Sequence, residues 1–115
     1  MKIEELKSAY EAAYQKSATD IFFSPGRVNL IGEHTDYNGG FVFPCALSFG
    51  TYLLISPNDE QKINFRSLNM EAVYALGLDE LTAPLPDKAW ANYPLGVFAQ
   101  FIKRGVAITQ GYDIL

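Results

Sequence analysis

Cysteine and histidine are almost absent from this chain of 115 residues, with Cys45 and His34 the only ones. A single cysteine cannot form an intrachain disulfide, and a single histidine without cysteine pairs lacks the ligand spacing of a zinc site. We therefore expect a fold without covalent crosslinks, in a reducing compartment. Cys45 lies in an apolar run, residues 43–47, which predicts a small buried hydrophobe and not a nucleophile.

Long apolar runs and clustered basic residues are also missing. No stretch reaches the roughly 18 apolar residues of a membrane span, and the N-terminus lacks the apolar core of a secretory signal. The nine Lys and Arg are scattered among thirteen Asp and Glu, which leaves a net charge of -4. Nucleic-acid binding needs clustered positive charge, so this balance argues against it. We expect a cytoplasmic protein that binds neither nucleic acid nor membrane.

Apolar residues make up 49% of the sequence, enough for one small domain with a core. Residues 2–16 repeat apolar side chains at helical spacing and predict an amphipathic helix. Residues 21–28 are apolar and extended but are interrupted at 24–26. Residues 41–43 and 51–55 have the β-branched and aromatic content of buried strands.

The next segments predict a hairpin and a connection. Residues 57–60 form a turn cluster, and residues 62–66 alternate polar and apolar side chains like a half-exposed strand. We therefore predict an antiparallel hairpin of 51–55 with 62–66. Residues 69–87 contain two prolines and predict an irregular connection with one short strand.

A second helix is predicted over residues 89–104, with Pro94 in its first turn and Gly105 as its C-terminal cap. The final residues, 111–115, read as a strand. Because a finished domain more often ends with a closing element or a polar tail, we expect the chain to be part of a longer protein.

The densest cluster of polar groups lies in the turn-rich segment 25–40. Glu33, His34 and Asp36 offer two carboxylates and an imidazole within four residues, a set that suits the hydroxyls of a sugar. Residues 38–40, Asn-Gly-Gly, allow the chain to reverse. Arg27 supplies a fixed planar charge suited to a phosphoryl group or a carboxylate.

Ordinary structure explains the same residues about as well. Arg27 and Glu33 would then be a structural ion pair, His34 a hydrogen-bonded turn residue, and residues 38–40 a plain hairpin turn. A metal site is not expected, because adjacent residues such as Glu33, His34 and Asp36 seldom converge on one ion.

Residues 25–40, PGRVNLIGEHTDYNGG, resemble the galactokinase signature, the first motif of the GHMP family of small-molecule kinases. Residues 41–47 follow it as the family's next strand does, and residues 90–93 with 96–97 resemble the start of a family helix near the nucleotide. The resemblance runs from about residue 20 to the C-terminus.

The resemblance implies a role for each matching residue. Glu33, His34 and Asp36 would hold hydroxyls of galactose, with Thr35 in the same segment. Arg27 would stabilise the phosphoryl-transfer transition state or lower the pKa of the attacking hydroxyl.

The resemblance also implies two nucleotide contacts. Trp90 would lie near the adenine, and Ser67 would contact the nucleotide. For Trp90 a core aromatic at a helix N-terminus is an equal alternative, and Ser67 has the alternative of a strand-end hydroxyl.

The family's second motif, a Gly- and Ser-rich phosphate loop, has no counterpart in these 115 residues. The aspartate base and the magnesium ligands follow that loop in the family. The resemblance thus implies part of an α+β GHMP N-terminal domain of the ribosomal S5 domain 2 type, an incomplete mixed sheet with packed helices.

On this reading residues 1–115 are the sugar-binding side of a galactokinase, and the rest of the N-terminal domain and the whole C-terminal domain lie outside the chain. The parent would use ATP and Mg²⁺, whereas the chain alone is expected to be inactive, to hold no metal and to bind no cofactor tightly. An unpaired sheet edge would favour non-physiological self-association.

Two alternatives remain at this point. The parent could be a kinase or sensor for a related sugar such as N-acetylgalactosamine, although Thr35 favours galactose. The chain could also be a stand-alone sugar-binding or interaction domain.

Overall fold

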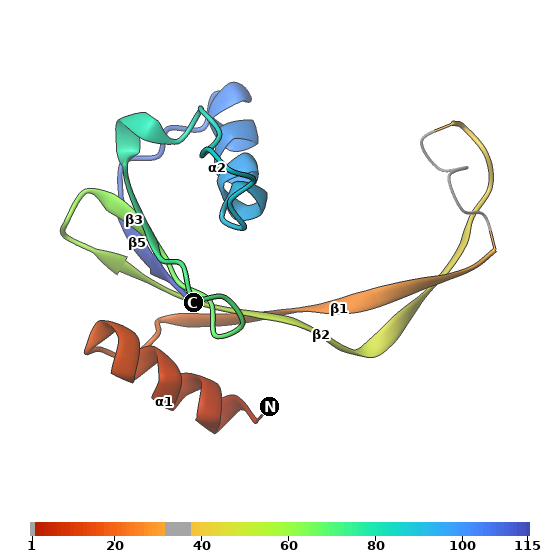
Figure 1. The fold of residues 1–115 in the computed structure, drawn as a ribbon, viewed down its shortest axis with the longest axis horizontal. Coiled ribbons are helices and arrows are strands. Elements are labelled where there is room, and N and C mark those ends of the chain that lie inside the picture. Colours follow the sequence, from red (N-terminus) through yellow and green to blue (C-terminus); the bar gives the residue numbers. More distant parts are fainter. Residues whose placement is uncertain (1, 32–37) are drawn as a thin grey trace. The chain divides into compact units, whose positions relative to one another are not determined.

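The computed structural model describes residues 2–31 and 38–115 (Figure 1). It contains two units, Met1–Asp20 with Leu54–Leu115, and Ile21–Leu53, which are described separately here. The elements, in order, are α1 (Ile3–Tyr14), β1 (Asp20–Ile31), β2 (Phe43–Asn58), β3 (Lys62–Phe65), β4 (Tyr74–Gly77), the short 3₁₀ helix η1 (Leu78–Glu80), α2 (Asn92–Lys103) and β5 (Gly111–Ile114).

One mixed sheet of five strands, in the order β1-β2-β5-β3-β4, organises the chain. The last strand, β5, lies inside the sheet, antiparallel to β2 and parallel to β3. Its Asp113 is opposite Ser56 on one side and Asn64 on the other. The predicted hairpin of 51–55 with 62–66 is therefore wrong, because β5 separates the two strands.

Gly111 explains how β5 enters between β2 and β3. A Cβ at this position would overlap the side-chain oxygen of Asn58 and come within 2.7 Å of the Lys62 carbonyl oxygen. Only glycine permits backbones and side chains to approach so closely. The turn predicted at 57–60 still connects the strands, but it leads from β2 to a strand two places away.

Helix α1 covers one face of the sheet in the first unit, and Figure 1 shows α2 on the other face. The helix predicted at 2–16 is confirmed as α1, with Glu4 and Glu5 in its first turn, where carboxylates favour the helix dipole. It ends at Tyr14 and is followed by the C-cap residue Gln15, whose backbone is left-handed at φ 60°. Its buried side chains are Leu6 and Tyr10.

Helix α2 confirms the second predicted helix. Pro94 is its third residue, a position at which a backbone N–H would have no intrahelical acceptor, so the missing N–H of proline costs no hydrogen bond. Gly105 lies just beyond the end of α2, at φ 91°. Leu95 is buried, and the ring of Phe98 meets that of Phe65 edge-on at 6.0 Å between centroids. The connection predicted at 69–87 contains one short strand, β4, as expected.

The second unit consists of the paired parts of β1 and β2. Strand β1 continues through residues 24–26, where the sequence predicted an interruption. Gly50 permits this continuity, because a Cβ there would overlap the carbonyl oxygen of Ser24 and lie 2.7 Å from Pro25 Cα. Strand β2 begins at Phe43 and contains the strand predicted at 51–55, whereas only residue 43 of the strand predicted at 41–43 belongs to it.

Cys45 is exposed, which corrects its assignment as a buried hydrophobe. Over residues 43–53, β1 is the only strand that pairs with β2 in the described part of the chain. The unit Ile21–Leu53 also contains no helix among its described residues. We call the paired residues 21–31 and 43–53 the ribbon. Among the described residues of this unit, no helix or third strand covers the apolar side chains of the ribbon.

Neither α1 nor α2 is long enough to cross a bilayer, and no other described segment forms a helix that could.

Two glycines with opposite surroundings provide a matched test of this fold. We expect Gly50→Ala to destabilise the ribbon by about 1–3 kcal/mol, because backbone atoms of β1 occupy the space of the new methyl group. Gly96 in α2 has no atom within 4 Å of its Cβ position. We expect Gly96→Ala to stabilise by about 1 kcal/mol, through helix propensity.

Urea unfolding gives the free energies, and amide hydrogen exchange locates the effect. Faster exchange confined to β1 and β2 is expected for Gly50→Ala. An exchange pattern equal to that of the unmodified chain would contradict the close approach at Pro25.

Candidate functional site

The residues expected to hold the sugar and the phosphoryl group fall in and beside the ribbon. Arg27 lies on β1, and its side chain is exposed. Glu33, His34, Thr35 and Asp36 lie outside the described residues, so their roles stay predictions. Asn38 and Gly39 form a turn before β2, with Gly39 at φ 78°, as the Asn-Gly-Gly pattern indicates.

The two residues expected to contact the nucleotide adjoin one connection, residues 66–73, between β3 and β4. Ser67 lies near its start, and its Oγ accepts a hydrogen bond from the Asn69 backbone N–H at 3.2 Å. Ala72 lies near its end, and its carbonyl oxygen accepts the indole N–H of Trp90 at 3.0 Å. The indole of Trp90 therefore contacts the same connection that contains Ser67.

Trp90 is half-buried just before α2. Its ring meets that of Tyr74 on β4 edge-on, with centroids 5.7 Å apart and planes at 68°. These contacts fit an aromatic anchor at the helix start, and they also leave part of the indole accessible. Both readings of Trp90 from the sequence are compatible with this position.

The segment before Trp90 has an unusual backbone. Asp87 and Lys88 both have left-handed conformations, at φ 59° and 52°. Each costs about 1–2 kcal/mol for a residue other than glycine. The Pro86 carbonyl accepts the Ala89 N–H at 3.3 Å across them, so they are the central residues of a hydrogen-bonded turn with positive φ at both positions, as in a type I′ turn.

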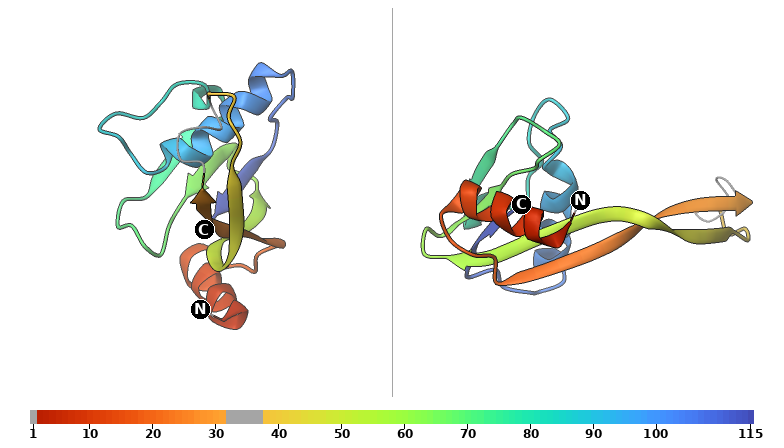
Figure 2. Two further views of the ribbon diagram at one scale, coloured as in Figure 1. Left: turned by 90° about the vertical axis from the view of Figure 1, so that its right-hand side faces the viewer. Right: turned by 90° about the horizontal axis from the view of Figure 1, so that it is seen from below.

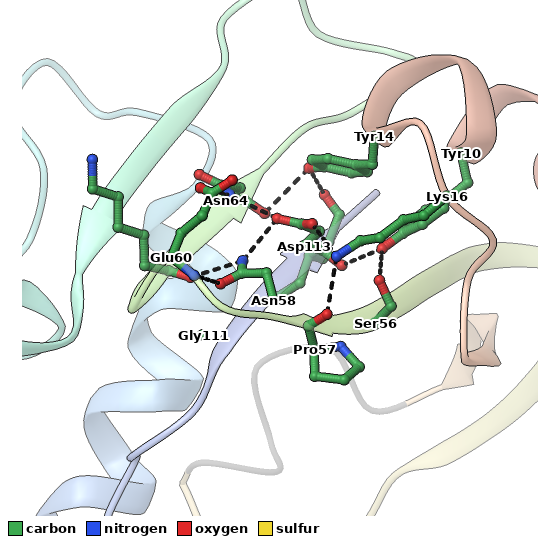
Figure 3. Close-up of polar contacts among 12 residues, drawn as sticks. Tyr10, Tyr14, Lys16, Ser56, Pro57, Asn58, Glu60, Asn64, Gly111 and Asp113 are labelled. Atoms are coloured by element: carbon green, nitrogen blue, oxygen red, sulfur yellow. Dashed lines mark hydrogen bonds and ion pairs between the residues drawn. The ribbon is translucent and has the colours of Figure 1, made fainter.

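A buried polar cluster, centred on Asp113 of β5, joins four elements of the first unit (Figure 3). Asp113 is 4% exposed. Its Oδ1 accepts hydrogen bonds from the side-chain amides of Asn58 at 2.8 Å and Asn64 at 2.6 Å. Its Oδ2 pairs with Lys16 Nζ at 2.7 Å, and the same ammonium donates to the Pro57 carbonyl. The carboxylate therefore connects β2, β3 and the segment after α1.

Two tyrosines of α1 complete this cluster. Tyr10 donates to the backbone carbonyl of Asp113 at 2.9 Å, and its hydroxyl lies 2.5 Å from Ser56 Oγ. Tyr14 donates to the Ile114 carbonyl at 2.7 Å. Burial raises the pKa of both phenols, so they stay neutral donors.

Asp113 remains ionised in this setting. Burial alone raises the pKa of its carboxyl, but hydrogen bonds from Asn64, Lys16 and Asn58 favour the charged form more strongly. The net effect holds the pKa below its ordinary 3.8. A buried carboxylate with three donors is a structural anchor, because its lone pairs are already engaged.

Beside the cluster is a cavity of about 450 Å³, bordered by Tyr14, Asn64, Arg66 and Tyr74. The guanidinium of Arg66 lies 5.4 Å from the centre of the Tyr14 ring, a cation–π distance. Glu60 and Asp113 also border it, so its walls carry both signs of charge. Neither Ser67 nor Trp90, the two residues predicted for the nucleotide, is among the described residues that border this cavity.

The polar cluster around Asp113 was not predicted from the sequence. Asn64 was placed on the solvent side of a half-exposed strand, whereas it faces α1 and Asp113. The available signal was the polar residue within each of three short apolar segments, namely Ser56, Asn64 and Asp113. Apolar side chains such as Phe65 and Ile114 point to the α2 side, so alternation alone did not reveal that both faces are covered.

Comparison with known proteins bears on the ribbon segment. Residues 8–57 match the family model described as the galactokinase galactose-binding signature. Galactokinases from Fusobacterium nucleatum and Clostridium beijerinckii are 46% and 47% identical to this chain, each over 98% of its length.

The chain belongs to the galactokinase family. It spans 30% and 29% of the length of these two galactokinases, so it corresponds to a part of each. The structure of Lactococcus lactis galactokinase complexed with galactose matches 98% of the chain and 30% of its own length, with a TM-score of 0.87 at 34% identity.

The fold extends beyond galactokinases. Methanococcus jannaschii mevalonate kinase matches 87% of the chain with a TM-score of 0.69 at 20% identity, a likeness of fold. These matches confirm the α+β GHMP architecture with its partial mixed sheet. They do not favour the alternatives of a kinase for another sugar or a stand-alone binding domain.

The Asp113 cluster predicts a large effect of Asp113→Asn. The change removes the charge that pairs with Lys16 and replaces one acceptor oxygen by an NH₂ donor, which must face either the Lys16 ammonium or the amide donors of Asn58 and Asn64. We expect a loss of about 3 kcal/mol in the free energy of unfolding, measured by urea titration. Asp59→Asn, the same change at an exposed turn, is the control and is expected to be neutral. Equal urea midpoints for the two variants would contradict the anchoring role.

The lowered pKa of Asp113 predicts a pH dependence of stability. Because the folded pKa lies below the ordinary 3.8, its contribution is complete above that value. It is lost as the pH falls through the folded pKa. The stability gap between the unmodified chain and Asp113→Asn should therefore narrow below about pH 4. A stability difference that stays constant down to about pH 2 would show that Asp113 has the same pKa in the folded and the unfolded chain.

Proposed function

We propose that this chain is the sugar-binding part of a galactokinase that transfers the γ-phosphoryl group of MgATP to the C1 hydroxyl of α-D-galactose, in the cytoplasm. The match of residues 8–57 to the galactose-binding signature carries this proposal. The likeness to a galactokinase complexed with galactose supports it. Residues 1–115 would form part of an N-terminal domain, with the remaining domain parts supplied by the rest of the enzyme.

Within this proposal the sugar is held by the segment after β1. Glu33 and Asp36 supply carboxylate oxygens that accept hydrogen bonds from sugar hydroxyls, and His34 adds a nitrogen donor or acceptor. Thr35 belongs to the same segment. Paired acceptors of this kind orient a sugar ring, because each carboxylate can accept from two neighbouring hydroxyls.

Arg27 has the chemistry for the transferred phosphoryl group. Its guanidinium is permanently charged and, on β1, exposed. Negative charge on the phosphoryl oxygens is stabilised by fixed cations, and a cation near the sugar also lowers the pKa of the attacking hydroxyl. Arg27 would thus act in the transition state more than in binding the ground-state sugar.

The nucleotide would meet Trp90 and Ser67. The partly accessible indole supplies an aromatic surface for adenine, and the Ser67 hydroxyl supplies a polar contact on the connection 66–73, which the indole N–H reaches at Ala72. These groups suit a nucleoside, whereas the triphosphate needs a backbone cradle that the sequence does not contain. No set of three potential metal ligands occurs among the residues that the structure describes. We infer that Mg²⁺ is held by the rest of the enzyme, because the resemblance places the family's magnesium ligands after the phosphate loop.

Arg27→Ala, in the protein encoded by the complete gene, tests the proposal. We expect kcat for ATP-dependent galactose phosphorylation to fall about 100-fold or more, with little change in the KM for galactose. Steady-state kinetics with galactose and glucose as acceptors measure both quantities. The unmodified protein should phosphorylate galactose and not glucose.

Two controls separate the parts of this proposal. The 115-residue chain alone should give no turnover. Turnover equal to that of the full protein would contradict the proposal that groups essential for catalysis lie outside residues 1–115. Lys103→Ala, at the end of α2, removes a cation from outside the motif and should leave kcat unchanged. A raised KM with unchanged kcat in Arg27→Ala would assign Arg27 to sugar binding instead.

A further inference from the structure

Asn92, the first residue of α2, closes the loop that carries Trp90. Its side-chain Nδ2 donates to the Leu85 carbonyl at 3.0 Å, and its Oδ1 accepts the Leu85 backbone N–H at 2.7 Å. Both polar backbone groups of Leu85 are thus bound by one amide. We call this pair of hydrogen bonds the Asn92 clasp.

The clasp attaches a proline-flanked point of the loop to α2. Leu85 lies between Pro84 and Pro86, neither of which has an N–H, so its own N–H is the sole backbone donor of these three residues. The two left-handed residues, Asp87 and Lys88, follow directly. The Pro86 carbonyl accepts the Ala89 N–H at 3.3 Å and closes the turn that these two residues form, and the clasp attaches the start of that turn to α2.

Trp90 lies inside the segment that the clasp closes. Its backbone carbonyl accepts the Tyr93 N–H at 3.2 Å, and its indole N–H reaches the Ala72 carbonyl. The ring also meets Tyr74. The orientation of the indole thus depends on the position of the Trp90 Cα in the loop. The clasp fixes that position by joining Leu85, before Trp90, to Asn92, after it.

We propose that Asn92 is a positioning residue for nucleotide binding: its clasp holds the indole of Trp90 in the orientation that presents a ring face to the adenine base. This inference rests on the proposed nucleotide contact of Trp90. Because the indole N–H is already engaged by Ala72, the base would be bound by stacking and not by a hydrogen bond to this nitrogen.

The chain contains a single tryptophan, so its fluorescence and its single indole N–H resonance report on this ring alone. The test compares Asn92→Asp and Asn92→Ala with Gln100→Ala, which removes an exposed amide from the same helix. Asn92→Asp keeps the acceptor for the Leu85 N–H but opposes the Leu85 carbonyl with a carboxylate. An acidic residue in the first turn favours the helix, so this variant separates the clasp from helix stability.

The measurements use the 115-residue chain, with adenosine as the probe. In Asn92→Asp we expect a red-shifted emission, stronger quenching by acrylamide and an unchanged thermal midpoint by circular dichroism. The adenosine-induced shift of the indole resonance, at fixed adenosine concentration, should fall by about two- to tenfold, the equivalent of one net hydrogen bond. Asn92→Ala should behave alike, and Gln100→Ala should match the unmodified chain.

Each other result decides a separate claim. Emission and quenching in both Asn92 variants equal to those of the unmodified chain would overturn the positioning role. If adenosine leaves the indole resonance of the unmodified chain in place, the nucleotide contact of Trp90 is wrong, and emission and quenching alone then decide whether Asn92 orients the ring. A lower thermal midpoint with unchanged emission would assign Asn92 to stability only.

Discussion

The ionised carboxylate of Asp113 holds the first unit together. It lies on the inner strand β5 and accepts from β2, from β3 and from the lysine that follows α1. A buried charge is tolerated only where its lone pairs are satisfied, and here the same donors that satisfy it also align the strands (Figure 3). Figure 2 shows the strands of the first unit and α1 from two further sides. The sheet order and the docking of α1 therefore depend on one side chain.

The sequence predicted the helices and most strands well, because periodicity and turn residues are local signals. Pro94 and Gly105 marked the ends of α2 correctly. The strand order could not be predicted from local signals, because no residue near Asn58 or Lys62 indicates that residues 111–114 lie between β2 and β3. Only Gly111, read together with the Asn58 side chain it approaches, carries that information, and the two are far apart in sequence.

The candidate site was predicted from a motif and not from physics alone. Composition left the segment 25–40 evenly balanced between sugar binding and ordinary turn chemistry, and the resemblance decided between them. Glu33, His34, Thr35 and Asp36 fall outside the described residues. The residues expected to serve the nucleotide lie in the first unit, whereas Arg27 lies in the ribbon. The Asn92 clasp was not predicted, because an asparagine at the start of a helix usually indicates an N-cap residue.

The inner position of β5 has a consequence for the order of folding. Tyr10 bonds to the backbone of Asp113, which is 103 residues further along the chain. During synthesis the ribosome releases α1 long before it releases the strand that α1 packs against. Helix α1 and the strands β2 and β3 therefore cannot form their contacts with β5 until residues 111–114 emerge. Until then β2 and β3 each present a strand edge that a chaperone or a neighbouring nascent chain can pair with.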